Sequence, residues 1–302
     1  MSNNLEATFK SQDTEEWLDI HFTRPLGLMW ANLFNRFNVH PNVVTLLSII
    51  LGAAAGVMFY YPDLLHTVAG ILLLVWANLY DSADGQLARM TGKKTMWGRV
   101  LDGFAGDVWF FAIYAAICLR LTPEWGIWIW LLAAASGFIF HAKQCQLADY
   151  YRNIHLYFIK GKSGSELDSS QKLRADFRAL TWRKDPVSKT FLYFYGNYTR
   201  SQEMQTPAFQ RFYAALRGRF GEQIPQTLRD DFRRGSLPLM KYANILTFNT
   251  RAIVLYVVML VGQPWLYFVF EVTVMTLIYC YMRSRHEGLC RELTARLNDY
   301  EA

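Results

Sequence analysis

Residues 64–102 read LLHTVAGILLLVWANLYDSADGQLARMTGKKTMWGRVLD, an apolar run followed by three acidic residues. On a helix, Asp81 and Asp84 lie about 60° apart, so their carboxylates share a face. Asp102 stands at the start of the next apolar segment and can supply a third carboxylate. Three acids at a membrane surface repel one another and are costly to desolvate, so we expect a divalent cation among them. An all-oxygen ligand set favours Mg²⁺ or Mn²⁺.

The composition is typical of a membrane protein. Of 302 residues, 52% are hydrophobic, 19% charged and 16% aromatic, which excludes a disordered chain and fits membrane helices with interfacial aromatic rings. The four cysteines lie in or beside apolar runs without a CxxC spacing, so we expect free thiols. Six apolar stretches predict membrane spans, at residues 43–60, 64–80, 107–121, 126–140, 245–262 and 265–282.

Basic residues are distributed unevenly between the two ends of these spans. The turns at residues 60–65 and 262–264 contain no Lys or Arg. Residues 147–243 hold 17 Lys and Arg against 9 Asp and Glu, a net charge of +8 in a chain whose total is +6. Because Lys and Arg resist translocation, we expect both termini, the acidic motif and this insert on the cytoplasmic side. The basic excess then suits anionic lipid headgroups, and we expect no nucleic-acid partner.

The predicted fold class is all-α, a polytopic membrane protein with six transmembrane helices. Residues 14–37 carry apolar side chains at helical spacing and predict an interfacial helix that packs on the bundle, docks on the membrane surface, or does both. The insert has helical patterning interrupted by prolines, which predicts a small helical subdomain. The expected segments are 1–42 (interfacial), 43–146 (spans one to four with the acidic motif), 147–243 (insert), 244–282 (spans five and six) and 283–302 (tail).

The motif has the form DGxxARx8GxxxD, from Asp84 to Asp102. This spacing resembles the signature of class I CDP-alcohol phosphatidyltransferases, also called CDP-alcohol phosphotransferases, which are membrane enzymes of phospholipid synthesis. The resemblance implies that Asp81, Asp84 and Asp102 bind the metal and the donor diphosphate. It also implies a CDP-linked donor, an alcohol acceptor, release of CMP, and a homodimer. By the same resemblance, Gly85, Ala88 and Gly98 would line the cytidine nucleotide, and Arg89 would support the site electrostatically.

One position departs from the family pattern. The family places a fourth Asp, the general base, four residues after the third, but that position is Gly106 here and the acid is its neighbour Asp107. On a regular helix, Asp107 would lie about 140° around from Asp102 and point away from the cluster. A π-bulge adds one residue to a turn and is often found at functional sites, so a bulge eased by Gly103 and Gly106 would deliver Asp107 to the metal and the substrate. Otherwise the base is another group.

Three other charged residues in or near the spans are weaker candidates. Lys143 and Arg251 stand at the predicted cytoplasmic ends of spans, where they would bind an acceptor phosphate or anchor the helices by snorkelling. Glu271 lies in the middle of the sixth predicted span, and an intramembrane acid is either functional or paired with a polar group such as Asn78.

Alternative functions stay open from the sequence. With its fourth acid displaced, the protein would instead transfer a phospho-headgroup between lipids without CDP, for example inositol phosphate from a phospholipid donor to ceramide. It would alternatively be a lipid-binding family member without catalysis. Ion or proton transport through the acids is less consistent with the sequence, because the three Asp residues cluster at one face and do not form a path.

Overall fold

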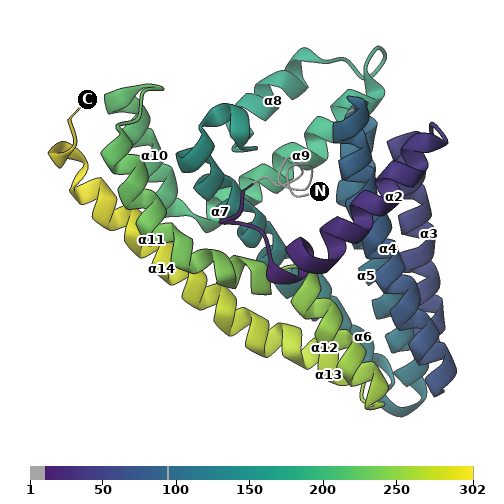
Figure 1. Ribbon diagram of the computed structural model, residues 1–302. Coiled ribbons are helices and arrows are strands. Elements are labelled where there is room, and N and C mark those ends of the chain that lie inside the picture. The colour runs from purple at the N-terminus through teal and green to yellow at the C-terminus, as the bar shows by residue number, and fades with distance from the viewer. Residues whose placement is uncertain (1–10, 94, 302) are drawn as a thin grey trace. The chain divides into compact units, whose positions relative to one another are not determined.

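The computed structural model describes residues 11–93 and 95–301, and this part of the chain contains helices and turns but no strand (Figure 1). The all-α prediction is therefore confirmed. Residues 1–10 of the expected interfacial segment and residue 302 of the tail lie outside the described residues. The described chain divides into two compact units, residues 11–139 with 251–272, and residues 140–250 with 273–301. The five segments expected from the sequence divide the chain by membrane topology and remain predictions.

The first unit contains the acidic motif. Its elements are η1 (Asp19–Thr23), α2 (Arg24–Arg36), α3 (Pro41–Tyr60), α4 (Leu64–Thr91), α5 (Met96–Trp125), α6 (Ile127–Ala134), most of α12 (Phe248–Leu260), and α13 (Trp265–Phe270). Helix α4 starts at Asp63, whose carboxylate accepts a hydrogen bond from the His66 amide at 3.1 Å. It ends at Gly92, whose φ of 67° is a left-handed conformation that suits glycine.

Helix α3 packs against both α4 and α5, because small residues let the backbones approach closely. A Cβ atom at Gly52 would lie 2.0 Å from Cδ1 of Trp109 on α5. One turn later, a Cβ at Gly56 would lie 2.8 Å from the backbone carbon of Ala112. These contacts fix α5 beside α3, and α4 packs on α3 as well. The two helices that carry the acids are thereby held by a common neighbour.

The amphipathic helix α2 lies along α4. Its Ala31 packs in a small core with Ala83 and Leu87 of α4, and Trp30 forms edge contacts with Tyr80 at a ring distance of 5.1 Å. The opposite face of α2 is apolar and exposed, with Met29 56% exposed. Packing on the bundle, one of the two roles expected for this segment, is present in the structure. Docking of the exposed face on a membrane stays a prediction.

Five helical stretches in the described chain are long and apolar enough to cross a membrane: Pro41–Tyr60, Leu64–Thr91, Leu101–Trp125, Gln226–Leu260 and Trp265–Ala295. They support an integral membrane protein. The fourth predicted span, residues 126–140, is not among them. It consists of the eight-residue helix α6 followed by the π-helical segment η2 (Ala135–His141). The count of six spans and the cytoplasmic orientation remain predictions.

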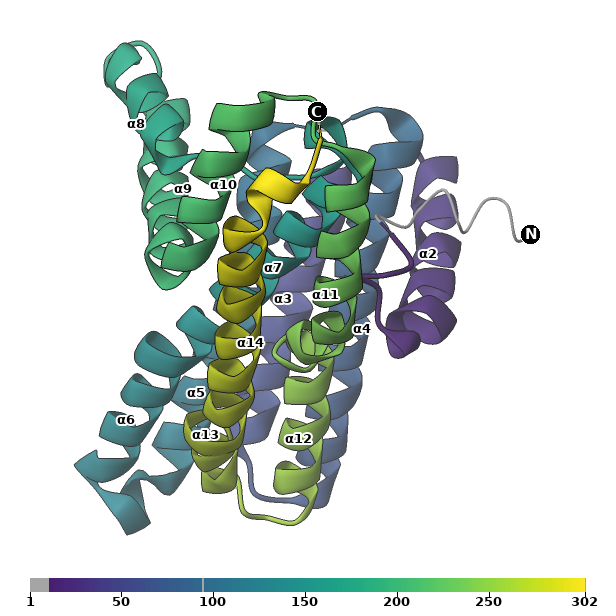
Figure 2. The ribbon, with the colours of Figure 1, turned by 90° about the vertical axis from the view of Figure 1, so that its left-hand side faces the viewer.

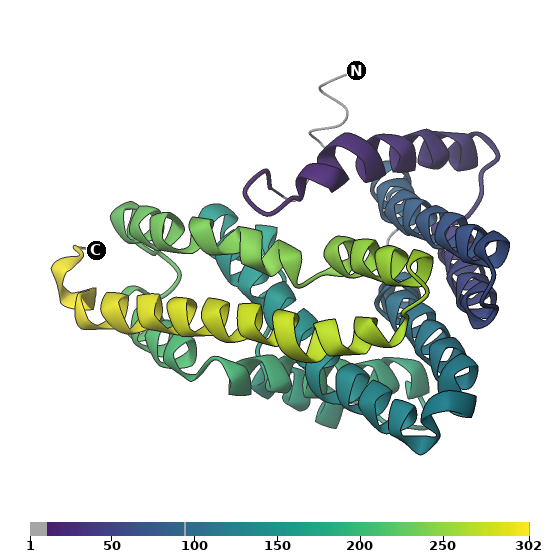
Figure 3. The same ribbon diagram turned by 90° about the horizontal axis from the view of Figure 1, so that it is seen from below.

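The second unit contains the basic insert. Its elements are α7 (Ala142–Lys160), η3 (Lys162–Gly164), α8 (Ser170–Ala179), α9 (Pro186–Gln205), α10 (Pro207–Phe220), α11 (Gln226–Ile245), α14 (Thr276–Ala295) and η5 (Leu297–Asp299). The π-helical segment η4 (Glu271–Met275) runs from the first unit into the second. Helices α8 and α9 lie side by side in Figure 2, and α11 lies along α14 in Figure 3. Stacked rings form the core, with Phe158 and Phe232 centred 3.8 Å apart. The predicted helical insert is therefore helical, and α14 packs against its helices α10 and α11.

Candidate active site

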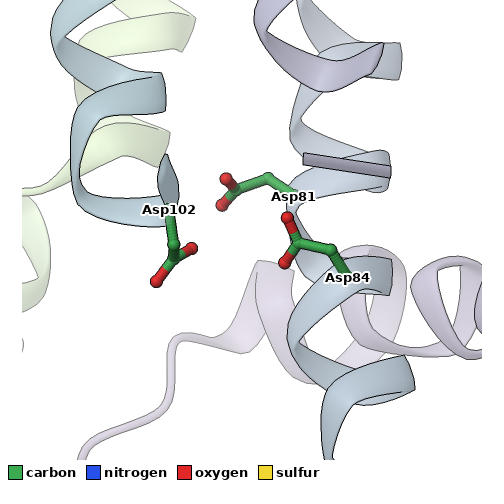
Figure 4. Close-up of side chains that lie close together, drawn as sticks. All are labelled: Asp81, Asp84 and Asp102. Carbon is green, nitrogen blue, oxygen red and sulfur yellow. The ribbon is translucent and has the colours of Figure 1, made fainter. Parts of the chain in front are cut away.

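Two helices of the first unit bring three carboxylates together. Asp81 and Asp84 project from the same side of α4, and Asp102 projects toward them from the first turns of α5 (Figure 4). One oxygen from each carboxylate lies within 4.8 Å of the others. The helical spacing predicted that Asp81 and Asp84 share a face, and the packing of α4 and α5 on α3 adds Asp102.

The environment of Asp84 fits a cation-binding site. The residue is only 4% exposed, and its Oδ2 atom is buried without a hydrogen-bond partner among the described residues. The Thr45 side chain of α3 lies near the same carboxylate, and its hydroxyl donates to the Pro41 carbonyl oxygen at 3.3 Å. A buried carboxylate oxygen with no donor is costly, and two neighbouring acids add repulsion. An all-oxygen group of this kind fits a hard divalent cation that would satisfy Oδ2 and offset the negative charge.

Space beside the acids is created at Gly85. A Cβ atom at this position would lie 3.5 Å from Nη1 of Arg89, which is ordinary van der Waals contact, so the packing of the protein itself does not require glycine here. The Arg89 side chain, one helical turn later, therefore lies over Gly85 and close to the acids. A small residue beside exposed cationic nitrogen atoms leaves room for an anionic ligand next to the carboxylate group.

The start of α5 is fixed by a short polar network. The Thr95 hydroxyl accepts a hydrogen bond from the Gly98 amide at 2.9 Å and donates to Oδ1 of Asn42 at 3.4 Å. A Cβ at Gly98 would lie 2.9 Å from that Asn42 oxygen. Gly98 is thus explained in part by the contact between the start of α5 and the start of α3. Ala88, the third small residue of the motif, is half-buried on α4.

The N-terminal segment also reaches the motif, which the sequence did not predict. The Gln86 side chain, between the acids and Arg89, donates to the Arg24 carbonyl oxygen at 3.1 Å. A Cβ at Gly27 would lie 2.7 Å from the Ser82 hydroxyl oxygen. Arg24 is ion-paired with Glu15 at 2.8 Å. The signal in the sequence for this close approach of α2 to α4 was Gly27, a glycine inside an otherwise amphipathic helix.

The motif lies inside a segment shared with known proteins. Residues 38–155 match the family model described as CDP-alcohol phosphatidyltransferase. These residues therefore resemble members of this family. The resemblance inferred from the spacing of the acids and small residues is confirmed. The match ends at residue 155, so most of the basic insert and the last two predicted spans, residues 245–262 and 265–282, lie outside it.

Individual relatives match about a quarter to a third of the chain. A segment of 97 residues is 32% identical to a bifunctional IPC transferase and DIPP synthase of Aquifex aeolicus and covers 32% of this chain and 22% of that protein. Over 100 residues the chain is 35% identical to a phosphatidylinositol phosphate synthase of Streptomyces avermitilis, covering 32% and 39% of the two proteins. Over 72 residues it is 36% identical to an archaetidylinositol phosphate synthase of Aeropyrum pernix, covering 24% and 36%. The matches thus span less than half of each of these relatives.

Asp107 lies apart from the acid group of this CDP-alcohol phosphatidyltransferase domain. The group that could hold a metal contains Asp81, Asp84 and Asp102 but not Asp107, which is exposed on α5. All residues from Asp102 to Asp107 are described and α-helical, so the structure has no π-bulge between them. A Cβ at Gly103 or at Gly106 would meet no atom within 4 Å. The segment therefore has room to rearrange, and the role of Asp107 stays a prediction.

The two basic candidates lie in different units. Lys143 is exposed on α7 of the second unit, where its ammonium donates to the Ser201 hydroxyl at 2.8 Å. Arg251 is fully buried in the first unit and ion-paired with Glu271. A buried guanidinium with a carboxylate partner neither snorkels nor presents its charge to an acceptor phosphate. One expectation for Glu271 was that it pairs with a polar group such as Asn78. Glu271 is indeed paired, but with Arg251.

Proposed function

We propose that this protein transfers a substituted phosphate group from a CDP-activated donor to an alcohol hydroxyl and releases CMP. The observation that carries the proposal is the carboxylate group of Asp81, Asp84 and Asp102, with its buried, unpartnered Asp84 oxygen. The match of residues 38–155 to the CDP-alcohol phosphatidyltransferase family model supports the same chemistry. We propose Mg²⁺ or Mn²⁺ as the cation, because carboxylate oxygens are hard ligands that favour these ions.

The reaction is a displacement at phosphorus. The acceptor oxygen forms a bond to the donor phosphorus, the bond from phosphorus to the CMP oxygen breaks, and CMP leaves with that electron pair. A bound divalent cation would neutralise charge on the diphosphate and on the leaving oxygen. The three carboxylates would hold that cation, and Arg89 would add positive charge beside it. Gly85, Ala88 and Gly98 would admit the cytidine nucleotide.

The acceptor hydroxyl also loses a proton. We propose Asp107 as the group that receives it, as the family pattern shifted by one residue suggests. This role requires a local rearrangement of α5, because the regular helix directs Asp107 about 140° away from Asp102. The glycines at 103 and 106 leave room for it.

The names of the relatives suggest which alcohol to test first. Relatives from Aeropyrum pernix and Pyrococcus horikoshii are named archaetidylinositol phosphate synthases, and one from Streptomyces avermitilis is named a phosphatidylinositol phosphate synthase. We therefore propose a phosphorylated polyol, first inositol phosphate, as the acceptor class, with a CDP-linked lipid as the donor. A cytoplasmic active site, cytoplasmic termini and a homodimer complete the proposal, and they rest on the Lys and Arg distribution and on the family resemblance.

The test is CMP release by the purified protein with CDP-diacylglycerol and a panel of alcohols, with and without Mg²⁺ or Mn²⁺. Metal-dependent CMP formation with one alcohol would support the proposal. Product formation from a phospholipid donor and ceramide in the absence of any CDP compound would favour headgroup transfer instead. Binding of metal and nucleotide without product from any donor would indicate a non-catalytic lipid-binding protein.

A further inference from the structure

The second unit contains an open pocket whose lining includes none of the residues assigned to the proposed transferase site. Its volume is about 520 Å³, and it lies where the end of α9, the start of α10 and the first residue of α8 meet. The residues that line it are Ser170, Arg200, Glu203, Met204, Pro207, Gln210 and Arg211. All of them belong to residues 140–250, so the pocket lies within a single unit.

Two arginines give the pocket its cationic character. Arg200 comes from α9 and Arg211 from α10, and both are exposed. Neither guanidinium forms an ion pair or a hydrogen bond with another residue in the described part of the chain. The carboxylate in the lining, Glu203, is occupied, since it accepts hydrogen bonds from the Ser170 amide at 2.9 Å and from the Ser170 hydroxyl. The arginine donors are therefore available to a ligand.

The walls of the pocket are held in place by polar contacts. The Gln210 amide donates to the Tyr150 hydroxyl at 2.9 Å and to the Thr206 hydroxyl at 3.2 Å. The start of α10 is fixed by Glu287, which accepts from the Ala208 amide at 2.6 Å. The two arginines thus stand on helices α9 and α10, whose junction is held by these hydrogen bonds, and this order lowers the entropy lost on binding.

Charge and polarity together indicate the ligand. Two guanidiniums and one carboxylate give the lining a net charge of +1, which matches a phosphodiester monoanion better than a phosphate monoester dianion. Arginine forks bind phosphate oxygens well. The rim is apolar at Met204, which is 69% exposed, and at Pro207. We propose that this pocket of the second unit binds the phosphodiester headgroup of an anionic membrane phospholipid. The proposal does not depend on the transferase activity.

The test measures binding of short-chain phosphatidylglycerol to the full chain in neutral detergent, below the micelle concentration of the lipid, by native mass spectrometry. Replacing both arginines, as Arg200→Gln with Arg211→Gln, should weaken the affinity of one bound lipid by roughly tenfold or more, because charge-assisted hydrogen bonds to phosphate are stronger than neutral ones. Lipid bound at the acid cluster would be unaffected. The matched control replaces Arg174 and Arg178, two exposed arginines of α8 outside the pocket.

Three results would overturn the proposal. Equal weakening in the pocket variant and in the α8 control would mean that binding follows only the net charge of the insert. Unchanged binding in the pocket variant would exclude the arginines as the site. If glycerol 3-phosphate binds to the pocket and phosphatidylglycerol does not compete with it, the ligand is a soluble phosphate ester. Circular dichroism of each variant, with unchanged helix content, would show that lost binding is not lost folding.

Discussion

The Arg251 guanidinium is ion-paired with the Glu271 carboxylate, and both side chains are completely buried in the first unit. Glu271 also accepts hydrogen bonds from the Ser136 hydroxyl at 2.7 Å, from the Tyr267 hydroxyl at 2.8 Å, and from Tyr114. One carboxylate therefore joins α5, η2, α12 and α13. Such a network stabilises only when every member has its partners.

Removal of either charged partner should destabilise the first unit, but unequally. Glu271→Leu removes the shared acceptor of four hydrogen-bond donors. We therefore expect the free energy of unfolding to fall by about 3–5 kcal/mol and Tm to fall strongly. Arg251→Met leaves a carboxylate that still accepts from three hydroxyls and should cost less. Thermal unfolding in detergent measures both. The double variant should be more stable than Glu271→Leu alone, and a double variant that is less stable would contradict the assignment of Glu271 as the acceptor of this network.

Asp84→Asn should abolish CMP release while the fold persists. The substitution keeps the size of the side chain but removes the charge of a buried acid of the group, so we expect loss of metal binding and at least about a 100-fold fall in kcat/KM. Electron paramagnetic resonance of bound Mn²⁺ and the CMP assay give independent readouts. Asp63→Asn is the control, because Asp63 caps the same helix at its other end, and Asn caps equally well. Turnover retained in Asp84→Asn would refute the proposed site.

Gly85→Ala should separate ligand binding from folding. Its Cβ would lie 3.5 Å from Arg89 and would strain nothing, and alanine gains about 1 kcal/mol over glycine in a helix, so Tm should hold or rise. If the nucleotide passes over this position, KM for the donor should rise severalfold. Gly56→Ala provides the contrast, since its Cβ would meet the Ala112 backbone at 2.8 Å and should lower Tm by overpacking. An unchanged KM in Gly85→Ala would place the nucleotide elsewhere.

The proposed movement of Asp107 can be tested at Gly106. In the regular helix a Cβ at Gly106 meets no atom within 4 Å, so Gly106→Ala should not harm the resting fold. If a bulge must form during the reaction, this substitution favours the regular helix and should reduce kcat with little change in donor KM. Asp107→Asn should then reduce kcat and leave Mn²⁺ binding intact. Full activity in both variants would show that another group accepts the proton.

Several features of this protein were predictable from residues close together in the sequence. The helical period alone places Asp81 and Asp84 on one face, and hydropathy alone indicates membrane helices without strands. The spacing from Asp84 to Asp102 was enough to indicate the family that residues 38–155 match. Each of these inferences uses short-range information, because a helix repeats every 3.6 residues whatever it packs against.

The contacts between helices were decided only by the tertiary structure. The sequence suggested a membrane-surface role for Arg251 and a group such as Asn78 as the partner of Glu271, yet these two residues pair with each other in the buried interior. The sequence likewise did not predict the hydrogen bond from the Gln86 side chain to the Arg24 carbonyl oxygen. The physical reason is that an interhelical contact depends on how each helix is rotated and how closely it approaches its neighbour. Small residues such as Gly52 and π-helical turns such as η2 set these quantities, and hydrophobic periodicity does not encode them.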